Sequence, residues 1–366
     1  MAFLPFVPEP ALSQAARITV SRSLGVKPGE RVLIITNPEP DVSEISLALY
    51  QEVKAAGGIP NLIWQETKGQ LDPMDDAVRG ALLTEPDVYI SMSAGKIGKD
   101  FKGVAEPYVG PDGTKYDSVG SFLIQGKKCT RGFWSPGISK ELYCAAVPAD
   151  FDQLAADCAW LAERLNRSVA VRVTSPGGTE LTFSTRGRRA FVDNGDFRQP
   201  GTGGNLPAGE SYISPVVGSA EGRIVFDGSM STHQGTLFLY HPITVEYEAG
   251  FITQIAGGEE AEALAETIRL GEENAAKMDP AYVRNARSLG ELGIGVNPLA
   301  GITGNMIVDE KAARTCHFAI GANYDHDGPA LIHLDGLVKE PTIELELEDG
   351  SKLVLLEDGE LVRNPG

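Results

Sequence analysis

The chain has 366 residues and carries 50 acidic side chains against 32 Lys and Arg, so its formal net charge is −18 at pH 7. This charge argues against nucleic acid or an anionic membrane as the main partner, because binding to phosphate groups requires an excess of Lys and Arg. The hydrophobic fraction of 42% and the charged fraction of 22% are typical of a globular protein and exclude a collagen-like or low-complexity chain. The length predicts two domains.

The first part of the chain alternates short strands with helices. Apolar or β-branched runs that follow turn residues predict strands at 31–36, 61–64 and 88–92. The spacing of apolar residues predicts helices at 43–56, 74–83 and 151–165. Strands and helices in this order favour a doubly wound parallel layer, so we expect an N-terminal α/β domain at residues 1–166.

The pattern changes after residue 166. Short strands separated by turn residues are predicted at 168–174, 180–184 and 189–193, and a long helix at 259–286. The tail alternates apolar and polar residues at 343–347 and 352–356, across the turn Asp349-Gly350, as a hairpin does. We therefore expect a second domain of mixed α+β structure at residues 167–366.

Targeting signals and several common motifs are missing from the sequence. The N-terminal stretch is apolar, but it contains Pro5, Pro8 and Pro10 and has no basic residue before Arg17, unlike a signal peptide. No apolar run approaches the ~18 residues of a membrane span, and the cysteines form no C-x-x-C pair. The sequence also lacks a P-loop and a G-x-S-x-G elbow. We expect a cytoplasmic protein that uses neither a nucleotide cofactor nor a serine nucleophile.

One candidate metal site lies in the predicted strand 331–335. His333 and Asp335 are two residues apart, so their side chains project from the same face of a strand and could hold one divalent ion. Taken alone, the pair is more often a core histidine bonded to an aspartate. Four further residues, each more often structural when taken singly, complete the candidate set: Glu210, Glu291, His317 and Tyr324.

The order and spacing of these residues resemble the aminopeptidase T family of two-metal aminopeptidases. The matching segments are NLPAGE (205–210), LGE (289–291), CHFAIGANY (316–324) and HLD (333–335), and the resemblance covers nearly the whole chain. It implies six metal ligands: Glu210, Glu291, His317, Tyr324, His333 and Asp335. It also implies a homodimer that hydrolyses N-terminal peptide bonds or related amide bonds.

The chemistry of this set agrees with that implication. Carboxylates, a phenol oxygen and imidazoles are ligands suited to Zn²⁺, Co²⁺ or Mn²⁺. Two such ions lower the pKa of a bridging water and produce hydroxide near neutral pH. One ion could polarise the scissile carbonyl while the other accepts the free amino group of a peptide. Glu210 or Glu291 could serve as the acid–base residue, and the sequence does not choose between them.

A second resemblance supports an alternative function. The run ELGIGVNP (291–298) is more similar to the iron-dependent dihydroxypyridine dioxygenases of nicotinate breakdown, which hold one iron with two histidines and one aspartate. Their pattern has a histidine where Glu291 stands and lacks counterparts of Glu210, His317 and Tyr324. A mononuclear Fe(II) dioxygenase is therefore the alternative to the aminopeptidase, and a non-enzymatic small-molecule binder is the third hypothesis.

Overall fold

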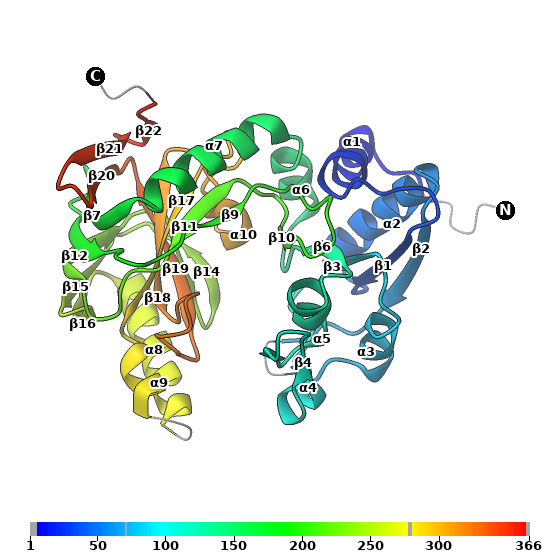
Figure 1. Ribbon diagram of the computed structural model, residues 1–366, viewed down its shortest axis with the longest axis horizontal. Coiled ribbons are helices and arrows are strands. Elements are labelled where there is room, and N and C mark those ends of the chain that lie inside the picture. The colour runs from blue at the N-terminus through cyan, green and yellow to red at the C-terminus, as the bar shows by residue number, and fades with distance from the viewer. Residues whose placement is uncertain (1–5, 70–71, 277–279, 364–366) are drawn as a thin grey trace. The chain divides into compact units, whose positions relative to one another are not determined.

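The computed structural model describes residues 6–69, 72–276 and 280–363 and divides into two compact units. The first unit runs to Asp152 and also includes Gly195–Ala208, and the second contains Gln153–Asn194 and continues from Gly209. The boundary predicted after residue 166 follows the helix Phe151–Leu165, whereas the division into units falls near the start of that helix. Both units are coloured along the chain in Figure 1.

The first unit contains the predicted parallel sheet. Its described strands follow the order β10-β6-β3-β1-β2, and every neighbouring pair is parallel. The strands are β1 (Arg31–Thr36), β2 (Ile59–Trp64), β3 (Val88–Met92), β6 (Arg131–Trp134) and β10 (Gly203–Asn205). A small hairpin adds β4 (Tyr108–Val109) and β5 (Lys115–Tyr116). The three predicted strands are thus present, and the α/β class is confirmed.

Helices cover this sheet in two groups (Figure 1). One group packs together and contains α1 (Pro10–Ile18), α2 (Pro40–Ala55) and α6 (Lys140–Ala146), with the π-turn η1 (Thr19–Ser23). The other contains α3 (Asp76–Leu82), α4 (Phe101–Ala105) and α5 (Val119–Ser121), with the π-turn η2 (Phe122–Gly126). Leu33, Ile35 and Tyr89 form one core cluster with side chains of α3, α5 and η2, so the odd-numbered residues of β1 and β3 face this second group.

The second unit is built on two antiparallel sheets. One has the order β14-β13-β19-β18-β17-β11-β9. Its strands are β9 (Phe191–Asp193), β11 (Glu210–Ile213), β13 (Ser229–Thr232), β14 (Gly235–Phe238), β17 (Leu289–Gly295), β18 (Thr315–Gly321) and β19 (His333–Lys339). The other has the order β16-β15-β12-β8-β7-β20-β21-β22. Its strands are β7 (Ser168–Thr174), β8 (Glu180–Ser184), β12 (Glu221–Phe226), β15 (Ile243–Glu248), β16 (Phe251–Ala256), β20 (Thr342–Leu347), β21 (Lys352–Glu357) and β22 (Glu360–Leu361). Phe183 of β8 meets Phe318 of β18 edge to face at 6.4 Å, which joins the inner faces of the two sheets.

Four helices accompany these sheets: α7 (Phe151–Leu165), α8 (Glu259–Ala275), α9 (Pro280–Asn285) and α10 (Met306–Asp309). The predicted helix 259–286 corresponds to α8 and α9, and its residues 277–279 lie outside the described part of the chain. The strand predicted at 331–335 begins at His333 and extends to Lys339.

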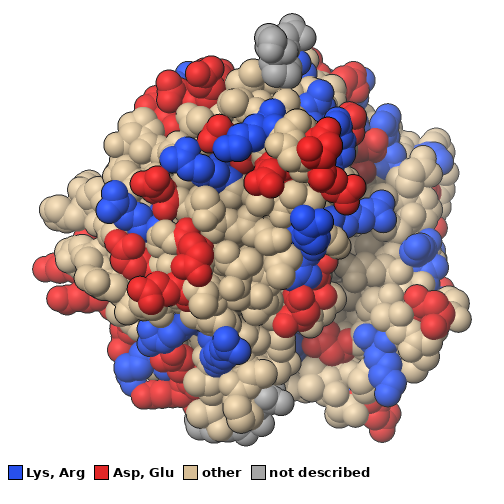
Figure 2. Space-filling model, turned by 60° about the vertical axis from the view of Figure 1, so that its left-hand side comes forward, with Lys and Arg blue, Asp and Glu red and all other residues tan. Residues whose placement is uncertain are grey.

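The surface carries both signs of charge. On the face drawn in Figure 2, acidic and basic side chains are interspersed rather than gathered into one patch. None of the helices among the described residues combines the length and apolar character that crossing a bilayer requires.

Candidate metal centre

Five of the predicted ligands come from four adjacent strands of the seven-stranded sheet. Glu210 opens β11, Glu291 lies on β17, His317 lies on β18, and β19 provides His333 and Asp335. The register explains why they meet, because Glu291 pairs with Ala319, and Ala319 pairs in turn with Asp335. Side chains at paired positions project from the same face of a sheet. The sheet therefore gathers residues that lie more than 100 positions apart in the sequence.

A glycine makes room for the His317 ring. His317 pairs with Gly293 across β17 and β18, and a Cβ atom added to Gly293 would lie 2.1 Å from the Nε2 of His317. The imidazole thus lies directly over the backbone of β17, and its Nε2 is 3.5 Å from Oε2 of Glu210 on the far side of that strand. Only a residue without a side chain permits this close approach.

Glu291 lies between the two imidazoles. Its Oε2 is 3.0 Å from the Nε2 of His333, and its Oε1 is 3.5 Å from the Nε2 of His317. His333 Nε2 is also 3.2 Å from Oδ1 of Asp335. Although burial opposes ionisation, hydrogen bonds from His317 and His333 lower the pKa of Glu291 to about 2. Glu291 is therefore an ionised carboxylate placed to share a cation with both rings.

A backbone carbonyl fixes the orientation of the His333 ring. Its Nδ1 lies 2.8 Å from the carbonyl oxygen of Ala322. A carbonyl can only accept a hydrogen bond, so Nδ1 carries the proton and donates it. Although burial opposes its charge, Asp335 and Glu291 raise the pKa of His333 well above its usual range, so Nε2 is also protonated in the metal-free protein. A metal ion would replace that proton on Nε2, which faces Glu291 and Asp335.

The sixth predicted ligand, Tyr324, lies beside the other five. Its ring packs edge to face against the His333 ring, with centroids 5.4 Å apart, and contacts the ring of Tyr212 at 4.8 Å. The negative charges of Glu291 and Asp335 raise the pKa of Tyr324 well above its usual range. The hydroxyl thus remains protonated unless a cation binds beside it.

A buried lysine that was not predicted from the sequence lies at this centre. Lys311 is fully buried, and its Nζ lies 2.5 Å from Oε1 of Glu210, 2.7 Å from Oε1 of Glu310 and 3.4 Å from Oδ2 of Asp193. Although burial opposes its charge, Glu210 and Glu310 raise the pKa of Lys311 well above its usual range. The only sequence signal was the Asp-Glu-Lys run shortly before the His317 strand, and such a run is usually solvated.

Glu210 has a different environment from Glu291. Its Oε1 bonds to Lys311, whereas its buried Oε2 has no hydrogen-bond partner among the described residues. Burial, together with the charges of Glu310 and Glu291, raises the pKa of Glu210 to about 8 despite the nearby lysine. A buried carboxylate oxygen without a partner requires a proton or a cation.

The donor atoms form two overlapping groups that could each hold an ion. One contains Glu210, Glu310 and His317, and the other contains Glu291, His317 and Asp335, with the atoms of each group all within 4.8 Å of one another. Oxygen and imidazole donors at this spacing, with one unpartnered buried oxygen, fit a divalent cation. The structure thus brings all six predicted residues into one cluster, while their role as ligands stays a prediction.

Comparisons with known proteins relate this chain to one family model and to two solved structures. A family model described as NicX, 2,5-dihydroxypyridine 5,6-dioxygenase, matches residues 145–363. The solved structure of 2,5-dihydroxypyridine dioxygenase from Pseudomonas putida KT2440 has a TM-score of 0.71 and 19% identity, covering 96% of this chain and 97% of that one. Wild-type AmpT from Thermus thermophilus has a TM-score of 0.65 and 17% identity, covering 96% of this chain and 99% of that one. No curated protein gives a significant match.

These comparisons favour the dioxygenase hypothesis over the aminopeptidase hypothesis. The matched family model is that of the dioxygenases, and the AmpT structure is similar at a lower TM-score. At these identities the two structures establish the fold alone. The chemistry has to be inferred from the residues that could bind metal.

Proposed function

The chain belongs to the 2,5-dihydroxypyridine 5,6-dioxygenase family, and we propose that this member uses its carboxylate-rich centre to hydrolyse an amide bond next to a free amino group. One observation supports this most directly. Five of the six residues that match the two-metal pattern bring their donor atoms into one largely buried cluster with Lys311, Glu310 and Asp193. The sixth, Tyr324, packs against the His333 ring and is 41% exposed. Fold and family alone do not determine chemistry, which depends on the residues of the site.

The balance of charge favours two divalent ions. Five carboxylates face the cluster, and one lysine neutralises one of them, so four remain to be balanced when the imidazoles are neutral. Two divalent ions would balance all four. Such ions, when bound, would supply a water of lowered pKa and an electrophile for the scissile carbonyl.

The two glutamates would have separate roles. Glu291, between the two imidazoles, would remain ionised and hold metal. Glu210, with one oxygen on Lys311 and the other unpartnered, would accept a proton from the attacking water and pass it to the leaving amine. Carboxylates whose surroundings move their pKa values apart are typical of such a division between proton donor and charged partner.

Lys311 would act as a positioning residue. Its ammonium holds Oε1 of Glu210 at 2.5 Å and leaves Oε2 directed toward His317, 3.5 Å away. Lys311 itself is fully buried, so the proton transfer would fall to Glu210.

A ring-cleaving dioxygenase with one Fe(II) is the second candidate, and the family match favours it. His333 and Asp335 would supply one imidazole and one carboxylate, and His317 would have to supply the second imidazole in place of the histidine that the dioxygenase pattern has at position 291. In this case Glu210 and Glu310 would be protonated, and Lys311 would balance the charge of Asp193. The objection to this candidate is Glu291, which adds a carboxylate between the two rings.

Metal content and two activities distinguish these functions. The full-length protein would be stripped of metal, reloaded with Zn²⁺, Co²⁺, Mn²⁺ or Fe²⁺, and analysed for metal per chain. Leucinamide hydrolysis and oxygen uptake with 2,5-dihydroxypyridine would then be measured on each form. The hydrolase hypothesis expects two ions per chain and amide cleavage.

Two variants complete the experiment. Glu210→Gln should abolish amide cleavage while leaving part of the metal bound, because Glu291, His333 and Asp335 are unchanged. Glu346→Gln, at an exposed position of β20, is the matched control and should behave like the wild type. One iron per chain with oxygen uptake and no amide cleavage would contradict the hydrolase hypothesis and support the dioxygenase hypothesis.

A further inference from the structure

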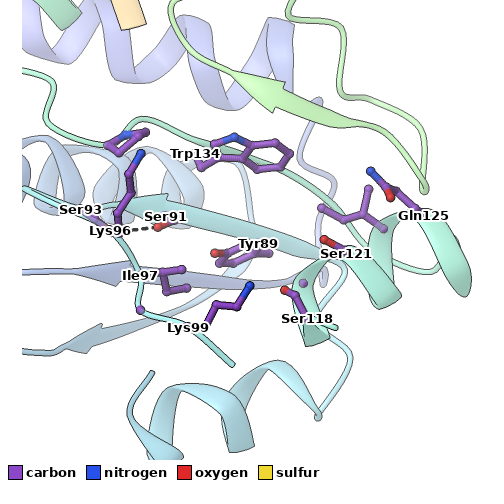
Figure 3. A pocket seen from close by; sticks show the side chains of 14 residues that line it. Tyr89, Ser91, Ser93, Lys96, Ile97, Lys99, Ser118, Ser121, Gln125 and Trp134 are labelled. Atoms are coloured by element: carbon purple, nitrogen blue, oxygen red, sulfur yellow. Dashed lines mark hydrogen bonds between the residues drawn. The ribbon is translucent and has the colours of Figure 1, made fainter. Parts of the chain in front are cut away.

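The first unit contains a cavity whose lining residues include none of the metal donors. It has a volume of about 400 Å³ and lies where strands β3 and β6 end (Figure 3). Its lining comes from β3, the loop at 93–99, the α5–η2 segment and the end of β6. In parallel sheets, ligands bind beyond the carboxyl ends of the strands, and this volume is within the range of small-molecule pockets.

Three hydroxyl groups form a row on one side of this cavity. Tyr89, Ser91 and Ser93 occupy alternate positions along β3 and its end, so they share a face. Ser91 and Ser93 are 4% and 1% exposed, and their Oγ atoms are 3.0 Å apart. Tyr89 is 6% exposed and precedes Ser91 by two residues on the same strand. Central parallel strands normally bury apolar residues on both faces, so this polar row needs an explanation.

This row places hydrogen-bond donors at the cavity wall. The Ser91 and Ser93 hydroxyls share one hydrogen bond, which uses one of their two protons. Hydroxyl groups donate most strongly to anionic acceptors.

The charged residues that line the cavity are all positive. Of its fourteen lining residues, Lys96 and Lys99 are basic and none is acidic, in a chain whose net charge is −18. Lys99 pairs with Asp117 at 3.2 Å, but both side chains are largely exposed, and such pairs contribute little. Lys96 has no ion pair among the described residues. The lining thus favours a negatively charged group.

Ser118, Ser121 and Gln125 add further polar groups to the lining, and the rest of the wall is apolar. Ile97, Ile124, Trp134 and Pro136 line it, and Figure 3 shows the rings of Trp134 and Tyr89 within the same site. Trp134 is 36% exposed, which is unusual for a large aromatic side chain and leaves part of its indole available for stacking. The cavity therefore offers an aromatic surface next to a cationic, hydroxyl-bearing one.

We propose that this cavity binds a small organic monocarboxylate with a planar apolar body. The carboxylate is held by the Lys96 ammonium and the serine hydroxyls, and the ring lies against Trp134. This site is separate from the proposed hydrolysis in chemistry, since its residues all belong to the first unit and the metal donors all belong to the second.

Calorimetric titration of benzoate into the full-length, EDTA-treated protein tests the proposal. Removal of metal makes the result independent of the proposed function. We expect one benzoate per chain and much weaker binding of benzamide, which has the same ring without the charge. Lys96→Gln and Ser93→Ala should each weaken benzoate binding by about tenfold, as expected for hydrogen bonds to a charged group.

Lys115→Gln provides the matched control, because Lys115 is an exposed lysine of the same unit outside the cavity. It should bind benzoate like the wild type. The proposal fails if benzoate does not saturate the protein, if benzamide binds equally well, or if Lys96→Gln and Ser93→Ala both leave the affinity unchanged. Lys96 is exposed, so its replacement is compatible with folding and the test does not depend on the buried serine alone.

Discussion

Replacing Gly293 by alanine is expected to displace the His317 ring and so to disrupt the metal centre. The added Cβ would lie 2.1 Å from both Nε2 and Cε1 of His317. Non-bonded carbon atoms pack at about 3.5–4.0 Å, so the ring would have to move by well over an ångström. His317 belongs to both groups of donor atoms, so its movement affects both.

Both the stability of the fold and the affinity for metal should decrease in Gly293→Ala. An extra methyl group in a packed interior costs about 1–3 kcal/mol of unfolding free energy. The affinity for metal should also fall, by about 10–100-fold, as it does when the groups that orient a metal ligand are changed. Urea unfolding of the metal-free protein would give the first quantity, and competition with a chromophoric chelator would give the second.

Gly301→Ala is the control for this comparison. Gly301 is exposed, and a Cβ atom there would meet nothing within 4 Å. It should change neither stability nor metal affinity appreciably. If Gly293→Ala bound metal as tightly as Gly301→Ala, His317 would not be a ligand and the proposed centre would be wrong.

Three further predictions concern stability. Lys311→Met removes a fully buried cation from a largely buried group of acids and should destabilise the metal-free protein by about 3–5 kcal/mol, measured by urea unfolding. Proton binding gives the second, because the folded-state pKa values of His317 and Glu210 are raised, to about 9 and about 8. A raised pKa means that the folded protein holds the proton more tightly than the unfolded chain, so stability falls as pH rises from 4.5 to about 8 for Glu210 and from 6.5 to about 9 for His317. The melting temperature of the metal-free protein should therefore fall between pH 6.5 and 9, and a flat profile would contradict the assignment. Glu30→Gln weakens the pair of hydrogen bonds to the buried Arg131, at 2.7 and 3.0 Å, and should cost about 1.5–3 kcal/mol by urea unfolding.

Much of the first unit could be predicted because its strands are short, nearly continuous apolar runs. β1 is buried at every position but its first, and β3 at every position, which is typical of a parallel sheet covered on both sides. The edge strand β10 was not predicted. It comes from the glycine-rich segment 201–209, and it joins the sheet through pairing with β6, about 70 residues earlier. Such pairing depends on tertiary structure, and three residues of the sequence Gly-Gly-Asn carry no strand preference.

The site was predictable to the extent that its spacing followed strand geometry. His333 and Asp335 share a face because they are two residues apart. The approach of His317 to Glu210 could not be predicted, because it depends on the register of three strands and on the missing side chain of Gly293. Lys311 was missed for a related reason, since a lysine buried by distant strands has the same local sequence as a solvated one.

The buried lysine also links the number of metal ions to the number of protons. Lys311 balances one of the five carboxylates, and two divalent ions would balance the other four without any proton. A single divalent ion leaves two acids uncompensated in a buried site, where isolated charges are costly. Those two acids must then be protonated, and Glu210 and Glu310 are the ones whose pKa values burial raises. A second ion at Glu210, Glu310 and His317 would thus replace protons on two glutamates. The hydrolase and the dioxygenase would then differ in whether this group of donors holds protons or metal.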